Sequence, residues 1–123
     1  MFDRSLARRL ALGRLAVGAA FAAAPGAASG PLVPREEAQQ RWPRLLARMF
    51  GIREIALAVL TLRAIRSGRD ARLVLALAAI CDTVDGVAAL TDATLPTALQ
   101  ATFAGAAFPT AAIELLMVLT GLD

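Results

Sequence analysis

The stretch Leu73-Val-Leu-Ala-Leu-Ala-Ala-Ile-Cys-Asp-Thr-Val-Asp-Gly-Val-Ala-Ala-Leu90 decides how this chain folds. It is almost entirely apolar, apart from the two carboxyl groups of Asp82 and Asp85. Its length approaches the ~20 residues with which an α-helix crosses a bilayer core about 30 Å thick. It lacks the strict alternation of a half-buried β-strand. The stretch therefore predicts a membrane-spanning helix that carries two acidic side chains.

Three more apolar segments accompany this one, and 58% of the 123 residues are hydrophobic. The four predicted spans cover residues 6–24, 45–65, 73–91 and 97–122. A soluble helical bundle would need a polar stripe along every helix, and residues 73–80 and 115–119 have none. The predicted fold class is therefore all-α: a four-transmembrane-helix bundle that forms a single integral membrane domain over residues 1–123.

The predicted connections are short and contain helix-breaking residues. Segments rich in Gly, Pro, Ser or Asp separate the spans at residues 25–31, 66–70 and 92–96. Between the first two spans, Pro34 opens a polar segment that ends near Pro43. We expect a short interfacial helix there, with Trp42 as its aromatic anchor at the membrane surface. A solvated loop is the alternative.

The arginines predict the orientation in the membrane. They cluster at the start of the first span and around the turn between spans two and three, whereas residues 92–96 carry none. Under the positive-inside rule this favours cytoplasmic N and C termini (N-in/C-in) in a bacterial inner membrane. Four arginines between spans one and two oppose this orientation and are partly offset by Glu36 and Glu37. The first segment also resembles a secretory signal, although Arg14 interrupts its apolar run.

The composition limits the possible chemistry. The chain has no histidine, so it lacks Ser-His and Cys-His nucleophile pairs and imidazole metal ligands. Its only cysteine, Cys81, cannot form an intramolecular disulfide. The net charge of +3 comes without a basic face interleaved with aromatic residues, which argues against nucleic acid as a partner. We expect no metal, no cofactor and no assignable catalytic residue.

Six ionisable residues lie well inside the predicted spans: Arg14, Arg53, Glu54, Asp82, Asp85 and Glu114. A charged side chain at the bilayer centre costs about 2.5–3.5 kcal/mol on insertion scales. We therefore expect these side chains to face one another or a water-filled cavity.

Depth along the spans divides the six residues into two groups. A polar cluster, which is also the candidate ligand site, lies about 9–14 Å below the outer surface at 1.5 Å per residue; it contains Arg53, Glu54, Asp82 and Asp85. Because Asp82 and Asp85 are three residues apart, they share one helix face, and Arg53 is the expected counter-ion. Arg14 and Glu114 fall in the inner half and form a second predicted pair.

The charges inside the spans do not balance, since four carboxyl groups accompany two arginines. At least one of Glu54, Asp82 and Asp85 should be protonated, or neutralised by a cation, a ligand or a partner chain. Three interpretations stay open. The cluster is a structural hydrogen-bonded network, a site for a ligand, ion or proton, or a docking site for a partner helix.

One catalytic motif is met only in part. The pattern Asp82-x-x-Asp85-Gly86-x-x-Ala89 resembles the opening of the CDP-alcohol phosphotransferase signature, a membrane family whose aspartates bind divalent metal. The remaining arginine, glycine and two aspartates of that signature are replaced by Leu90, Leu99, Phe103 and Ala107. We therefore reject this assignment.

A second resemblance covers nearly the whole chain. Its residues are the segment 48–57 with Phe-Gly-Ile-Arg-Glu, Gly13-Arg14 in the first span, and the pair Asp82 and Asp85. In this pattern the chain resembles a group of small four-span bacterial membrane proteins that are defined only as a domain of unknown function. The resemblance implies a four-helix architecture and no particular activity.

The leading hypothesis is a small, non-catalytic integral membrane protein with a buried polar cluster. Its expected partners are the lipid bilayer and either another membrane subunit or further copies of this chain. In a rival hypothesis it is a membrane enzyme or carrier for a lipid-like small molecule. Asp82, Asp85 and Glu54 would then act as acid and base, with Arg53 orienting the ligand. A third hypothesis makes the same residues a proton or cation relay.

Overall fold

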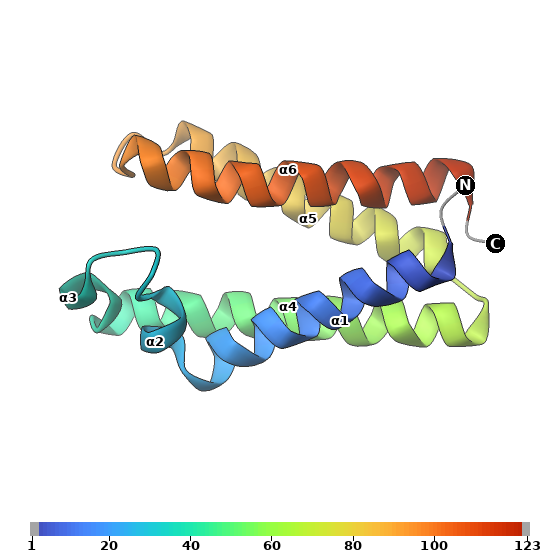
Figure 1. Ribbon diagram of the computed structural model, residues 1–123, viewed down its shortest axis with the longest axis horizontal. Coiled ribbons are helices and arrows are strands. Elements are labelled where there is room, and N and C mark those ends of the chain that lie inside the picture. Colours follow the sequence, from blue (N-terminus) through green and yellow to red (C-terminus); the bar gives the residue numbers. More distant parts are fainter. Residues whose placement is uncertain (1–2, 122–123) are drawn as a thin grey trace. The chain divides into compact units, whose positions relative to one another are not determined.

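The computed structural model describes residues 3–121, and its regular secondary structure is helical throughout that range (Figure 1). The helices are α1 (Arg4–Ala23), α2 (Pro25–Ser29), α3 (Arg35–Ala38), α4 (Arg41–Ser67), α5 (Ala71–Thr91) and α6 (Thr97–Thr120). The predicted all-α class is confirmed. The predicted end of the fourth span at Leu122 lies outside the described residues.

Two of the described helices, α5 and α6, are long and apolar enough to cross a membrane. Of the other two long helices, α1 carries its four arginines from Arg4 to Arg14, and α4 carries arginines along its length together with Glu54. These charges lower the mean hydropathy of α1 and α4. The criterion of length and apolar character thus supports two of the four predicted spans.

The chain divides into two compact units. The α1–α4 unit comprises Arg8–Arg63 and contains most of α1 and α4 together with α2 and α3. The α5–α6 unit comprises the residues that precede and follow this segment.

In the α1–α4 unit the buried positions follow helical periodicity. On α1 they are Ala11, Arg14 and Gly18; on α4 they are Ala47, Gly51, Glu54, Leu57, Ala58 and Thr61. Spacings of three and four residues place each set along one helix face. The two helices meet where these faces have no side chain. A Cβ atom on Gly18 would lie 2.7 Å from the carbonyl oxygen of Gly51.

Two short helices connect α1 to α4, and they differ from the prediction. Pro25, predicted to lie in a break, is the first residue of α2, since proline is tolerated at a position whose amide needs no partner. The predicted polar helix is shorter than expected, because α3 ends at Ala38. Trp42 lies in the first turn of α4 and is 71% exposed.

The α5–α6 unit is a helical hairpin. The turn before α5 uses left-handed backbone at Gly68 (φ 67°) and Asp70 (φ 60°). Between α5 and α6, the Asp92 carboxylate accepts hydrogen bonds from the backbone amide of Thr94 at 2.9 Å and from its hydroxyl at 2.6 Å. These bonds hold the pKa of Asp92 below its usual value.

The two helices of the hairpin pack along their length (Figure 1). The helices fit closely at Gly86, where a Cβ atom would lie 2.8 Å from the ring of Phe108. The buried positions of α5 repeat every three or four residues, at Leu75, Ala78, Ala79, Asp82, Gly86 and Ala89. Helix α6 continues through Pro109 without interruption.

Candidate functional site

The candidate site begins with an arginine on the buried face of α1. Arg14 lies between Ala11 and Gly18 in the buried stripe, and only 8% of its surface is exposed. Small neighbours leave room along this face for a long side chain. Burial of a guanidinium group without a partner would be costly, so the position of Arg14 requires an acceptor nearby.

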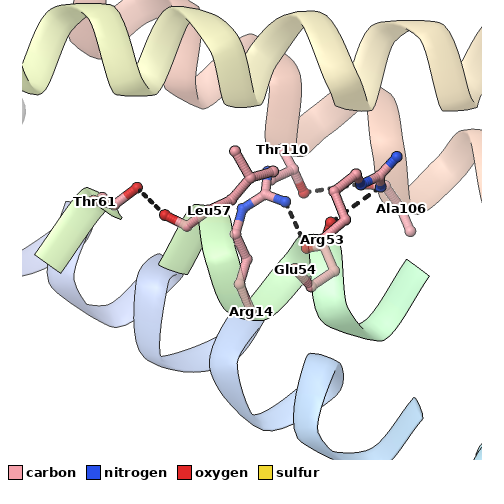
Figure 2. A network of polar contacts seen from close by, with 7 residues as sticks. All are labelled: Arg14, Arg53, Glu54, Leu57, Thr61, Ala106 and Thr110. Carbon is pink, nitrogen blue, oxygen red and sulfur yellow. Dashed lines mark hydrogen bonds and ion pairs between the residues drawn. The ribbon is translucent and has the colours of Figure 1, made fainter. Parts of the chain in front are cut away.

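Glu54 of α4 provides that acceptor. It occupies the buried stripe of α4 and is 5% exposed. The Nη1 atom of Arg14 donates a hydrogen bond to Oε2 of Glu54 at 2.6 Å (Figure 2). The contact joins residues that are 40 positions apart in the sequence. It is therefore a tertiary ion pair that ties α1 to α4.

Arg53 approaches the same carboxylate from the other side. Its Nη2 atom donates to Oε1 of Glu54 at 3.0 Å, and about a third of its side chain is exposed. Its guanidinium carbon lies 5.1 Å from the centre of the Phe50 ring, within the range of a cation–π interaction. Phe50 in turn meets Phe21 of α1 edge-to-face, with ring centres 5.2 Å apart. These contacts fix the Arg53 side chain beside the ion pair.

The arrangement at Glu54 holds a carboxylate rather than presenting it to a substrate. Each of its oxygen atoms accepts a charge-assisted hydrogen bond from a different arginine. A general base must lie within hydrogen-bond reach of the proton that it removes. At Glu54, a guanidinium group lies against each carboxylate oxygen, in the place where the substrate's proton would have to be. The geometry is therefore that of a structural link between helices.

The α5–α6 unit contains the other three predicted site residues. Asp82 is 6% exposed and Glu114 is 2% exposed, whereas Asp85 is half-buried. The antiparallel packing of Gly86 beside Phe108 sets Asp82 level with Ala112. Glu114 is two residues further along, which is about 3 Å along the helix axis. The hairpin thus carries two buried carboxyl groups at nearly the same level.

The structure brings together only some of the predicted residues. Arg53 and Glu54 are in direct contact. The ion pair between Arg14 and Glu54 differs from the sequence-based prediction, which pairs Arg14 with Glu114. Asp82, Asp85 and Glu114 belong to the other unit. The pairings of Arg53 with the aspartates and of Arg14 with Glu114 therefore stay predictions.

A signal for the missed pair is present in the sequence. Gly18 and Gly51 mark the positions where two antiparallel helices can approach closely. If these glycines are aligned, Arg14 and Glu54 stand opposite each other, since each lies about one turn from its glycine. The predicted depth of each charge in the membrane does not reveal this register between the two helices.

The described part of the chain contains no group of three or more acidic, cysteine or histidine side chains that could hold a metal ion. The single thiol, Cys81, is half-buried next to Asp82. Comparison of the chain with protein-family models, with curated proteins and with solved structures found no significant match.

Proposed function

We propose that this chain is a four-span protein of a bacterial inner membrane that acts as a non-catalytic subunit, assembling with a partner membrane protein or with further copies of itself. The observation that carries the proposal is the buried ion pair of Arg14 and Glu54, closed by Arg53. These three charged side chains link α1 to α4, and they do not form an open site.

Membrane insertion of all four long helices is supported by where their side chains lie. The two charged residues of the buried stripes, Arg14 and Glu54, form a buried ion pair with each other. Large apolar residues are instead exposed along the helices, among them Leu46, Ile52, Leu73, Ile80, Val84 and Leu119. A surface of this kind suits contact with lipid or with another membrane helix.

A non-catalytic role is supported by the small size of the connections. The segment between α4 and α5 and the segment between α5 and α6 each contain only a few residues. They leave no room for a soluble catalytic domain.

We also assign the chain, as part of this proposal, to the small four-span bacterial proteins of unknown function that share its Gly-Arg, Phe-Gly-Ile-Arg-Glu and paired-aspartate pattern.

The topology is tested by thiol labelling in intact cells. After Cys81→Ser, single cysteines are introduced by Arg69→Cys, Gln40→Cys or Thr94→Cys. A membrane-impermeant reagent added outside should label the variants at 40 and 94, whereas the variant at 69 should react only after the membrane is opened. Labelling of all three in intact cells would contradict the four-span orientation.

The subunit role is tested by native mass spectrometry of the protein extracted gently from its own membranes. We expect a second polypeptide at fixed stoichiometry or a defined homo-oligomer. The complex should persist in Arg53→Gln, whose side chain is partly exposed, if the arginine acts only within the chain. A bare monomer under all extraction conditions would contradict the proposal.

A second candidate function is a carrier, enzyme or proton relay built on the α5–α6 unit. The observation that favours it is the burial of Asp82 and Glu114 at nearly the same level of an apolar hairpin. Buried carboxyl groups in spanning helices are often part of proton or substrate pathways. In this case Asp82→Asn should preserve folding and abolish proton uptake into vesicles or retention of a co-purified small molecule. A change in stability alone would favour the structural role.

A further inference from the structure

The α5–α6 unit contains a cavity of about 400 Å³ that the proposed function does not use. It lies where the turn between α4 and α5 meets the end of α6 and the start of α1. Its lining includes Arg4, Gly68, Asp70, Arg72, Thr120 and Gly121. Two further arginines lie nearby in the sequence, Arg66 in the last turn of α4 and Arg69 in the turn that follows it.

The two arginines of the cavity differ from the arginines of the buried cluster. Arg14 and Arg53 both donate to Glu54. The guanidinium groups of Arg4 and Arg72, by contrast, make no hydrogen bond or ion pair with any residue between positions 3 and 121. Among residues 3–121, the lining holds one carboxylate, Asp70, against two guanidinium groups. This described part of the lining is therefore net positive and offers unused hydrogen-bond donors.

The position of Arg72 and the first backbone amides of α5 add further hydrogen-bond donors at the cavity. An Nη2 atom of Arg72 lies 3.2 Å from the position that a Cβ of Gly121 would occupy, so the guanidinium is held against the end of α6. Helix α5 begins at Ala71, and Asp70 provides no side-chain cap for its first amides. Uncapped amides and guanidinium groups are both donors that suit an anion.

We propose that this cavity binds a phosphate group. Guanidinium groups bind phosphate oxygens through paired N–H donors, which explains two arginines around one cavity better than a single-atom anion would. The cavity lies at the ends of α4 and α6, so on the proposed function it opens at the cytoplasmic membrane surface. The phosphate there belongs to an anionic lipid headgroup; the same donors would also accept a soluble phosphate.

The test compares two double variants of the full-length protein in detergent. Arg4→Gln with Arg72→Gln removes both guanidinium groups of the cavity. Arg66→Gln with Arg69→Gln removes the same charge from two exposed arginines outside the described lining, one in the last helical turn of α4 and one in the connection to α5. Short-chain phosphatidylglycerol, phosphatidylcholine and inorganic phosphate are titrated separately and followed by calorimetry. Thermal unfolding of each variant confirms that it is folded.

We expect the cavity variant to bind phosphatidylglycerol at least about tenfold more weakly than wild type, which corresponds to the loss of a charge-assisted hydrogen bond. The control variant should remain within about threefold. Phosphatidylcholine should bind weakly to all three proteins. If inorganic phosphate binds with the same dependence on Arg4 and Arg72 and phosphatidylglycerol does not, the cavity takes a soluble phosphate.

Equal losses in both variants would overturn the proposal, because they would indicate general surface charge. Absence of saturable binding of either ligand to wild type would overturn it as well. These outcomes are separate from the topology test. A protein that binds inorganic phosphate through Arg4 and Arg72 but fails the labelling test keeps the phosphate site and loses the four-span proposal. A protein that passes the labelling test but binds neither ligand keeps the four-span proposal and loses the phosphate site alone.

Discussion

Gly18 and Gly51 are in backbone contact across α1 and α4. A Cβ atom on Gly51 would lie 2.6 Å from the carbonyl oxygen of Gly18, and one on Gly18 would lie 2.7 Å from the carbonyl oxygen of Gly51. Helices approach this closely only where side chains are absent. The contact sets the register of the two helices, and with it the meeting of Arg14 and Glu54.

The first prediction concerns this contact. Gly18→Ala or Gly51→Ala should lower the free energy of unfolding by about 2–3 kcal/mol, because the new methyl group meets backbone that cannot move aside. Thermal unfolding in detergent measures the change. The control is Gly13→Ala in the same helix, where a Cβ has nothing within 4 Å. That change should be neutral or stabilising by up to about 1 kcal/mol. Equal effects at the three positions would contradict the close approach.

The second prediction concerns the buried ion pair. Arg14→Met or Glu54→Leu should each destabilise the protein, by up to about 3–5 kcal/mol, because either change breaks a buried ion pair. Arg14→Met should cost less than this upper value, because Arg53 still donates to Glu54. The double variant should be more stable than the sum of the two losses, because both charges are removed together. A double-mutant cycle gives the coupling free energy, and we expect at least about 1 kcal/mol. Additive losses would show that the pair is not coupled.

The third prediction concerns Gly86 on α5 and Phe108 on α6. Gly86→Ala should destabilise the hairpin by about 1–2 kcal/mol, because the added Cβ would lie 2.8 Å from the phenyl ring. The neighbour here is a side chain, so the second change Phe108→Leu should recover part of the loss. Gly105→Ala, on the same helix as Phe108 and with open space around it, is the control. No recovery in the double variant would count against this packing.

The fourth prediction concerns Asp92 in the connection between α5 and α6. The hydroxyl of Thr94, followed by its backbone amide, lowers the pKa of this carboxyl group. Because the folded-state pKa is the lower one, the stabilisation is present above the unfolded-state pKa and disappears as the pH falls through the folded-state pKa. Thr94→Ala should raise the pKa of Asp92 part of the way to its usual value. NMR of the labelled carboxyl carbon measures this.

Thr91→Ala is the matched control for that titration. The hydroxyl of Thr91 donates to the Val87 carbonyl at 2.8 Å and does not contact Asp92. Its removal should leave the pKa of Asp92 unchanged. An equal rise in both variants would mean that the Thr94 hydroxyl has no specific effect.

The helices themselves were largely predictable, and their ends were less so. The apolar runs at 73–91 and 97–122 correspond to α5 (Ala71–Thr91) and, within the described residues, to α6 (Thr97–Thr120). Helix α4 begins at Arg41 and extends to Ser67, beyond the predicted 45–65. Hydropathy marks where a chain is apolar, whereas arginine is a good helix former and continues a helix past that point.

The candidate site was predictable as a set of residues but not as a set of pairs. The cost of charge in an apolar segment singled out Arg14 and Glu54 from composition alone. Their pairing depends on which faces of α1 and α4 meet and at what register. Two glycines fix both, and small residues are too frequent in this chain for their role to be evident from spacing.

Pro109 weakens the backbone hydrogen bonding of α6 at one point, although the helix is continuous there. Proline has no amide hydrogen, so the carbonyl of Gly105 lacks its usual donor one turn later. Thr110 follows at once, and its hydroxyl donates to the Ala106 carbonyl (Figure 2). One rung of the hydrogen-bond ladder is thus missing between two intact half-helices. We expect α6 to bend at this point on the microsecond timescale of collective helix motions, with deuterium uptake concentrated there.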